Sequence, residues 1–304
     1  MLTGRETIGT AFAETGHRHR DRPAVGRQRW GDLAGRVRFV ALGLAEAGVG
    51  RGEHVSLQGL DDADRWAVGL AAACIGAVVT PTGEGHSVDD MAEAVERGRR
   101  VDESSPSRFE ELRDAVSPDD DAFAEVELTY TGANLLWGAA SLAAALGAGP
   151  EDRLLSTLPH VVAAGWVAGV LVPVVTAASS VRGAADRPTL LVVGDADAAG
   201  LATSAAGLEG VRLALVVDAG AGARRLAETG VPVRSATAFP GHAGLVTGDR
   251  GTPLPGVTVG IADDGEVLVR SDAVAPARCD DGWLRTGRKG ELDTGGRLVV
   301  VATG

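Results

Sequence analysis

The sequence predicts an α/β protein: two α/β subdomains with mainly parallel sheets packed through helices, followed by a small β-barrel-like subdomain. Two observations indicate this fold class. Helical and strand patterns alternate between residues 32 and 233, which is typical of parallel sheets covered by helices. From residue 250 onward, short strand patterns are joined by Asp263-Asp264-Gly265 and Thr294-Gly295-Gly296, which are hairpin turn signals.

The expected elements follow from periodicity. Apolar and small residues recur at helical spacing over residues 5–16, 32–47, 64–74, 88–97, 133–146, 196–206 and 223–229. Short runs rich in Val, Ile and Leu predict strands at residues 54–57, 76–80, 153–157, 174–181, 189–193, 213–217, 231–233, 257–261, 266–270 and 297–301. In the helix over 32–47, Asp32 is placed to cap the start and Gly48 the end.

We expect three subdomains, at residues 1–182, 183–248 and 249–304. Residues 83–121 are acidic, rich in arginine and poor in large apolar side chains, so we expect this segment to be polar and partly mobile. Residues 161–181 carry no charge and are long enough to span a membrane. Gly169 and Pro173 interrupt them, and we predict a buried helix that ends before Pro173, followed by a buried strand.

The charge balance excludes some classes of partner. The chain has 304 residues with 29 Lys+Arg and 41 Asp+Glu, a formal charge of −12, and no basic stripe. This argues against nucleic acid as the main partner and against binding to an anionic membrane. Cys74 and Cys279 are too few for a disulfide framework, and the chain opens without a signal-peptide pattern, so we expect a cytoplasmic protein. Lys289 is the only lysine.

Three sequence blocks, taken in order, carry a family resemblance. Residues 30–81 contain Leu-Ala-Glu-Ala-Gly-Val-Gly-Arg-Gly-Glu-His-Val, and residues 129–181 contain Gly-Pro-Glu-Asp-Arg and Leu-Pro-His. Residues 251–301 contain Gly-Thr-Pro-Leu-Pro-Gly-Val-Thr-Val and Asp-Gly-Trp-Leu-Arg-Thr-Gly. The chain thus resembles the large N-terminal domain of the adenylate-forming (AMP-binding) acyl-CoA synthetases. That resemblance implies joining of a carboxylic acid to the α-phosphate of ATP, followed by acyl transfer to the thiol of CoA or a carrier protein.

The motifs that carry this chemistry in the family are altered here. The phosphate-binding loop corresponds to residues 127–134, which hold one glycine and no lysine, whereas a phosphate cradle needs several converging amides. Pro240 and Gly241 stand where the family has the threonine and the magnesium-binding glutamate. In Thr286-Gly287-Arg288, Arg288 replaces a ribose-binding aspartate, and a guanidinium donates hydrogen bonds where a carboxylate accepts them.

The sequence ends where the family's hinge and swinging domain would begin, so we expect that domain, with its lysine, to be absent. Without these groups we expect no catalytic residue, no metal site and no cofactor; ATP with Mg²⁺, and CoA, are the ligands that the resemblance implies, and the altered motifs argue against ATP and Mg²⁺.

The candidate ligand-binding residues lie around the implied acyl pocket and the altered nucleotide cleft. They are His160, Gly165, Trp166, Gly241, His242, Thr286 and Arg288. Each has a plain structural alternative: a hydrogen-bonded core or loop histidine, a core tryptophan, or a solvated basic pair.

Three functional hypotheses remain open. The first is a degenerate synthetase-like protein that has lost adenylation and binds an acyl, CoA or related small molecule. The second is an interaction or regulatory scaffold, either as a homodimer or as the partner of an intact synthetase or a carrier protein. The third is an enzyme whose chemistry has been repurposed, using Arg288, His160 or His242.

Overall fold

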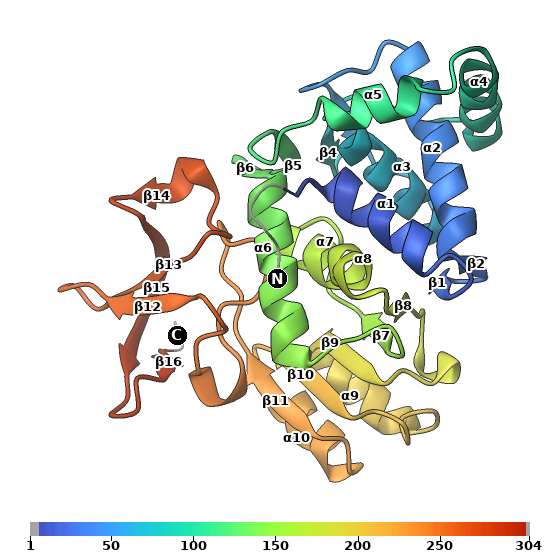
Figure 1. The fold of residues 1–304 in the computed structure, drawn as a ribbon. Helices are drawn as coiled ribbons and strands as arrows, with labels where there is room; N and C mark the ends of the chain where they lie inside the picture. The colour runs from blue at the N-terminus through green and yellow to red at the C-terminus, as the bar shows by residue number, and fades with distance from the viewer. Residues whose placement is uncertain (1–5, 302–304) are drawn as a thin grey trace. The chain divides into compact units, whose positions relative to one another are not determined.

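The structure is a computed structural model that describes residues 6–301. The chain divides into two compact units, residues 1–136 and 137–304, and both combine helices with a sheet (Figure 1). The predicted α/β class with mainly parallel sheets is therefore confirmed. The finer division at residues 182 and 248 stays a prediction.

The sheet of unit 1 has four strands in sequential order. They are β3 (His54–Ser56), β4 (Val78–Thr80), β5 (Asp121–Glu125) and β6 (Leu128–Thr131). Strands β3, β4 and β5 run parallel, and β5 and β6 form an antiparallel hairpin. A further antiparallel hairpin joins β1 (Pro23–Val25) and β2 (Gln28–Arg29). The pair β5 and β6 has no counterpart among the expected elements.

Five helices build the rest of unit 1. They are α1 (Ile8–Arg18), α2 (Trp30–Glu46), α3 (Asp62–Cys74), α4 (Met91–Ser104) and α5 (Arg108–Asp114). Their core includes the tilted rings of Trp30 and Trp66, whose centroids are 6.2 Å apart. Helix α2 begins two residues earlier than expected, because Arg29 is the N-cap and Asp32 lies one turn inside, where its carboxylate accepts the Arg29 N–H at 3.3 Å.

Helices α2 and α4 pack with their backbones in close contact. A Cβ on Gly98 of α4 would lie 1.7 Å from the Phe39 carbonyl oxygen of α2, and a Cβ on Gly43 would lie 2.1 Å from the Ala94 carbonyl oxygen. Only glycine permits this approach at either position.

The segment 83–121 contains more regular structure than its composition predicts. Helix α4 continues seven residues beyond the expected end, and α5 follows it. Arg38 of α2 binds Asp102 at 2.7 Å and Glu110 at 2.5 Å, and its guanidinium lies 5.1 Å from the ring centre of the buried Phe109. The charges that gave the segment a disordered composition therefore hold α4 and α5 to α2.

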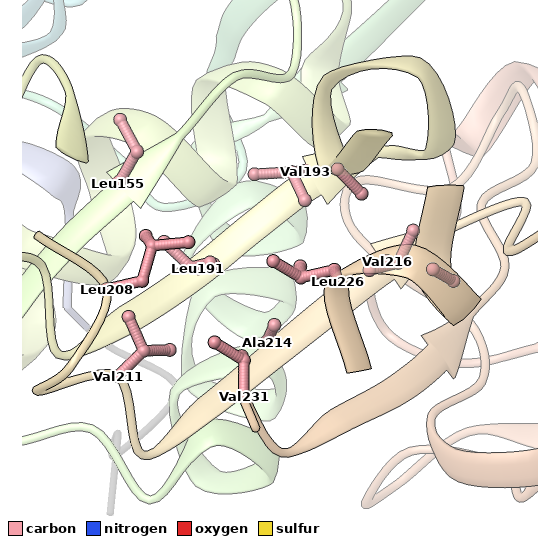
Figure 2. Close-up of a cluster of buried hydrophobic side chains, with 11 residues drawn as sticks. Leu155, Leu191, Val193, Leu208, Val211, Ala214, Val216, Leu226 and Val231 are labelled. Atoms are coloured by element: carbon pink, nitrogen blue, oxygen red, sulfur yellow. The ribbon is translucent and has the colours of Figure 1, made fainter. Parts of the chain in front are cut away.

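Unit 2 contains a parallel sheet. The strand order is β11 (Val233–Ala236), β10 (Leu213–Val217), β9 (Leu190–Gly194), β7 (Arg153–Ser156) and β8 (Ser179–Ser180). Helices α9 (Asp195–Ser204) and α10 (Ala221–Glu228) contact each other and the strands. Figure 2 shows the side chains buried there, among them Leu191, Val216 and Leu226. Alternate residues of β9 and β10 fill this core, as the period of a strand requires.

Three consecutive helical segments form a single irregular helix. They are α7 (Ala163–Trp166), the π-helical turn η1 (Val167–Leu171) and α8 (Val172–Thr176). The helix therefore does not end before Pro173, and the strand expected at 174–181 is reduced to β8. Within residues 6–301 no helix combines the length and apolar character needed to cross a bilayer.

The C-terminal part of unit 2 is antiparallel. The strand order is β12 (Thr258–Ile261), β13 (Glu266–Arg270), β15 (Trp283–Leu292) and β14 (Cys279–Asp280), and β16 (Leu298–Val300) pairs with β15. The turns at 263–265 and 294–296 are confirmed. Strand β15 was not expected, because most of its side chains are exposed and its pairing with β13 has an irregular register.

The remaining regular segments are α6 (Gly132–Leu146), which contains the boundary between the units, and three 3₁₀ turns, at Ala184–Asp186, Asp249–Gly251 and Pro276–Arg278.

Candidate functional site

His160 and Trp166 lie together at the start of the irregular helix. Their ring centroids are 6.2 Å apart and the rings are nearly perpendicular, at 89°, which is a favourable edge-to-face arrangement. Trp166 is buried, while His160 is half-buried. The two residues that the sequence placed in the acyl pocket are therefore neighbours, and only the histidine has a solvent-accessible part.

Two glycines allow the loop carrying His160 to contact this helix. A Cβ on Gly165 would lie 1.9 Å from the Pro159 carbonyl oxygen, and a Cβ on Gly169 would lie 2.3 Å from His160 Nε2. Gly165 was a candidate ligand-binding residue, and its contact is with the protein's own loop. Gly169 was not a candidate, although it forms the surface against which the imidazole packs.

The π-helical turn at Val167–Leu171 has a local cause. Pro173 carries no N–H, and its ring excludes the carbonyl group four residues earlier, that of Gly169, from a regular α-helical position. One wider turn accommodates the ring without ending the helix. Such turns are frequent at functional sites, and the sequence signal for this one is Pro173 inside an apolar helix with Gly169 one turn before it.

His242 is enclosed in a network of hydrogen bonds. Its side chain is 1% exposed. Nδ1 lies 3.4 Å from the Gly244 carbonyl oxygen and Nε2 lies 2.9 Å from Ser271 Oγ, while Ser271 Oγ accepts the Ala273 N–H at 3.2 Å. A carbonyl oxygen only accepts, so Nδ1 carries the proton and Nε2 accepts the Ser271 hydroxyl hydrogen.

Burial lowers the pKa of His242 to about 4, although the hydrogen bond to Gly244 opposes this shift. The imidazole is therefore neutral at pH 7, in agreement with the tautomer that its neighbours require. Because both nitrogens are engaged, a metal ion would have to displace Ser271 from Nε2. Ser271 is 29 residues away in sequence and could not have been identified as the partner of His242 without the structure.

The loop carrying Gly241 and His242 contacts the irregular helix. A Cβ on Gly244 would lie 3.6 Å from Cγ1 of Val167, the residue after Trp166. On its other side, a Cβ on Gly241 would lie 2.9 Å from Leu284 Cδ1 on β15. The structure therefore brings the His160 and His242 regions next to each other within unit 2.

Thr286 and Arg288 form a separate group on β15. Thr286 Oγ1 donates to the Val267 carbonyl oxygen at 2.8 Å and accepts the Arg288 N–H at 3.2 Å. The Gly287 N–H donates to Glu266 Oε1 at 2.8 Å. The Arg288 side chain is exposed, and it makes no ion pair within the part of the chain that the structure describes.

Lys289 is bound to the hairpin turn. Its Nζ donates to the Asp264 carbonyl oxygen at 2.8 Å and lies 3.3 Å from Asp264 Oδ2. This lysine lies within β15, opposite Glu266.

Four consecutive amides where β6 meets α6, those of residues 131–134, are engaged internally. Thr131 N–H donates to Asn134 Oδ1 at 3.0 Å, and Asn134 N–H donates to Thr131 Oγ1 at 3.2 Å. The Gly132 N–H donates to the Asp120 carbonyl oxygen at 3.0 Å, and the Ala133 N–H donates to the Pro118 carbonyl oxygen at 2.7 Å.

No protein-family model matches the sequence, and no curated protein matches it. Solved structures do match. An artificially fused adenylation-PCP di-domain of a non-ribosomal peptide synthetase, NpsA-ThdA from Klebsiella oxytoca, aligns with a TM-score of 0.79 and 17% identity over 99% of this chain and 72% of its own. The NpsA N-terminal subdomain in complex with anthranilyl-AMSN aligns with a TM-score of 0.76 and 16% identity over 98% of this chain and 100% of its own.

A putative long-chain-fatty-acid CoA ligase from Rhodopseudomonas palustris aligns with a TM-score of 0.79 and 18% identity, over 98% of this chain and 99% of its own. The chain has an adenylation-domain fold. At these identities the likeness concerns the fold, and the chemistry has to be judged from the residues present.

In this adenylation-domain fold the resemblance places the phosphate-binding loop at residues 127–134. A phosphate cradle presents backbone N–H groups to the anion, but the amides of residues 131–134 already have partners within the protein. The amides of residues 131–134 therefore offer no free donor to a phosphate group. Residues 6–301 also bring together no group of three His, Cys, Asp or Glu side chains able to hold a metal ion.

Proposed function

We propose that this protein does not adenylate carboxylic acids and that it binds a small acyl or CoA-type molecule through unit 2. The proposed loss of adenylation rests on one observation: all four amides of residues 131–134 already donate hydrogen bonds within the protein. Binding a phosphate there would require breaking these hydrogen bonds, and each buried amide left without a partner costs about 1–3 kcal/mol.

The acyl side supports the binding half of the proposal. His160 packs on Trp166 and against Gly169, and it keeps part of its ring exposed. The accessible part of His160, backed by the buried Trp166, offers a polar edge to a carbonyl or thioester group. His242 is enclosed by protein in the loop that contacts Val167, so we assign it to the support of this region. A direct ligand contact by Gly241 or His242 would require the loop to open.

Two assays test the two halves separately. Pyrophosphate release measured with a panel of carboxylic acids should stay at the level of a blank, and robust turnover would refute the negative half. Thermal shift measurements with ATP, AMP, CoA and acyl-CoAs should show stabilisation by an acyl-CoA or CoA and none by ATP with Mg²⁺.

The site itself is tested by a matched pair of variants. His160→Ala should abolish the ligand-induced shift, whereas His54→Ala, a change at an exposed histidine of unit 1, should leave it unchanged. Equal responses of both variants would place the ligand elsewhere.

A second candidate is a carrier-protein partner, favoured by the fact that one structural neighbour is an adenylation-PCP fusion. On this hypothesis the exposed and unpaired Arg288 is available to an acidic surface. Co-purification with a carrier protein, lost in Arg288→Glu and retained in Arg18→Glu, would support it; retention of the partner by Arg288→Glu would count against it.

A further inference from the structure

Unit 1 has a surface pocket that none of the functional hypotheses uses. Its volume is about 810 Å³, and it lies at the C-terminal ends of α2 and α4 and the start of α5. Arg97, Arg100 and Arg108 line it, together with Ser105 and a single acidic residue, Glu46. The charged groups of the lining sum to +2, three arginines against one glutamate, in a chain whose formal charge is −12.

Two helices supply these arginines to the pocket. Arg97 and Arg100 are three residues apart on α4 and therefore share a face, and Arg108 begins α5. The Gly98 contact with the Phe39 carbonyl holds α4 against α2. Arg38 of α2 fixes the connection between α4 and α5. Besides its ion pairs with Asp102 and Glu110, it donates to the Pro106 carbonyl oxygen at 2.6 Å.

The nearby acidic residues neutralise part of the charge of the pocket and, in the described part of the chain, leave Arg100 uncompensated. Asp102 and Glu110 bind Arg38 and are not part of the lining. Arg97 pairs with Glu93 at 2.5 Å and Arg108 pairs loosely with Glu111 at 3.5 Å; neither glutamate lines the pocket. Arg100 makes no ion pair with any residue between 6 and 301.

These arginines are not needed to cap the helix ends. At the end of α4 the Val101 carbonyl oxygen already accepts the Ser105 N–H at 2.8 Å and the Ser104 hydroxyl at 3.0 Å. Within the described residues, none of the three guanidinium groups donates to a backbone carbonyl. Arg100 therefore keeps all its donors for a ligand, and Arg97 and Arg108 keep those that Glu93 and Glu111 do not engage.

We infer that this pocket binds a small molecule carrying a diphosphate or polyphosphate group. The planar guanidinium binds phosphate oxygens in pairs, and three of them around one space match an anion of several charges. The volume is within the range of about 300–1,000 Å³ for small-molecule sites. Its three arginines distinguish it from the acyl site of the proposed function, on which it does not depend.

The test uses the full chain and isothermal titration with inorganic pyrophosphate, with ADP, and with adenosine. We expect pyrophosphate and ADP to bind and adenosine not to bind. ADP binding more tightly than pyrophosphate identifies a nucleotide as the source of the diphosphate, and equal affinities identify the phosphoryl groups alone; both support the site.

The variants separate the site from general charge. Arg97→Gln/Arg100→Gln/Arg108→Gln should weaken pyrophosphate binding at least about tenfold, since one charge-assisted hydrogen bond contributes about 1.5–3 kcal/mol and 1.4 kcal/mol is tenfold. The control is Arg99→Gln, on the same helix but outside the lining. It removes one charge where the triple variant removes three, so it is compared with the single variant Arg100→Gln. Arg99→Gln should change the affinity less than about twofold. The arginines are at the surface, and unchanged circular dichroism establishes that the variants fold.

Three results would overturn the inference. They are absence of pyrophosphate binding at millimolar concentration, equal affinity of the triple variant and the original chain, and an equal loss in Arg99→Gln. Binding of a polyglutamate peptide as tightly as pyrophosphate would also exclude a phosphoryl ligand. Chemical modification of arginine by phenylglyoxal gives an independent measurement: pyrophosphate should slow the reaction at Arg100 and leave Arg99 unaffected.

Discussion

Asp152 and Arg212, 60 residues apart, form a two-point ion pair. Arg212 Nε lies 3.0 Å from Asp152 Oδ1, and a terminal guanidinium nitrogen lies 2.7 Å from Oδ2. The same guanidinium donates to the carbonyl oxygens of Leu146, at 3.0 Å, and Gly147, at 2.7 Å, at the end of α6. Asp152 belongs to the Gly-Pro-Glu-Asp-Arg motif, so this part of the family pattern joins α6 to the parallel sheet.

Asp152→Ala should therefore destabilise the protein by about 2–3 kcal/mol, because it leaves four donors without their acceptor. Denaturant unfolding measures the change, with Asp186→Ala, on an exposed 3₁₀ turn, as the control. Burial raises the pKa of Asp152, but hydrogen bonds from Arg212, Thr189 and Gly149 outweigh burial and hold it below the usual value. The contribution of Asp152 is therefore complete above pH 4 and should decrease as the pH falls below that value.

Acidification should also destabilise the protein through His242. The pKa is about 4 in the folded state and about 6.5 in the unfolded state, so the unfolded chain binds more protons between these values. The free energy of unfolding should then decrease from pH 6.5 to pH 4, by about 3 kcal/mol in total. His242→Gln removes this titration, and the difference between the two pH profiles isolates it from the other groups. Parallel profiles would contradict the buried neutral imidazole.

Asp195, the first residue of α9, fixes the start of α10. Its carboxylate accepts the N–H groups of Gly220 at 2.7 Å, Gly222 at 3.1 Å and Ala223 at 2.8 Å. Asp195→Ala should cost about 1–2 kcal/mol, the usual effect of losing a helix cap. Asp195→Asn retains one oxygen and should cost less. A stability of Asp195→Ala equal to that of the original chain would show that solvent replaces these bonds.

Gly169→Ala should destabilise unit 2 by about 1–3 kcal/mol, because the new methyl group meets His160 Nε2 at 2.3 Å. In a His160→Ala background this contact no longer exists, and alanine is the better helix former. The same substitution should then be neutral or stabilising. A double-mutant cycle followed by thermal unfolding measures the coupling, and additive effects would exclude the contact as the cause.

The sequence predicted best the elements that packing dictates directly. Strands β10 and β13 occupy the predicted residues, because continuous Val and Leu runs are buried there. Prediction failed where a local rule did not hold in the folded chain. Pro173 was expected to follow the end of a helix, but a π-helical turn accommodates its ring and the helix continues. Strand β15 was overlooked because three of its exposed positions carry cationic side chains.

In the candidate site, too, some contacts could be predicted from the sequence and others could not. His160 and Trp166 are six residues apart, so a sequence pattern can place them together. The carbonyl groups of Pro118 and Asp120 that accept the first two amides of α6 belong to another segment, and no residue type marks a carbonyl as an acceptor. That contact could only be found in three dimensions.

The close approach of α2 and α4 at Gly98 has a consequence for how this protein tolerates mutation. Where backbones already touch, removing side-chain atoms opens little empty space, whereas adding a single methyl group forces two helices apart. A chain with 43 glycines should therefore show an asymmetric mutational spectrum in a deep substitution scan. Replacements that enlarge a residue where α2 and α4 touch, as at Gly43 and Gly98, should be depleted more strongly than replacements that make a residue smaller.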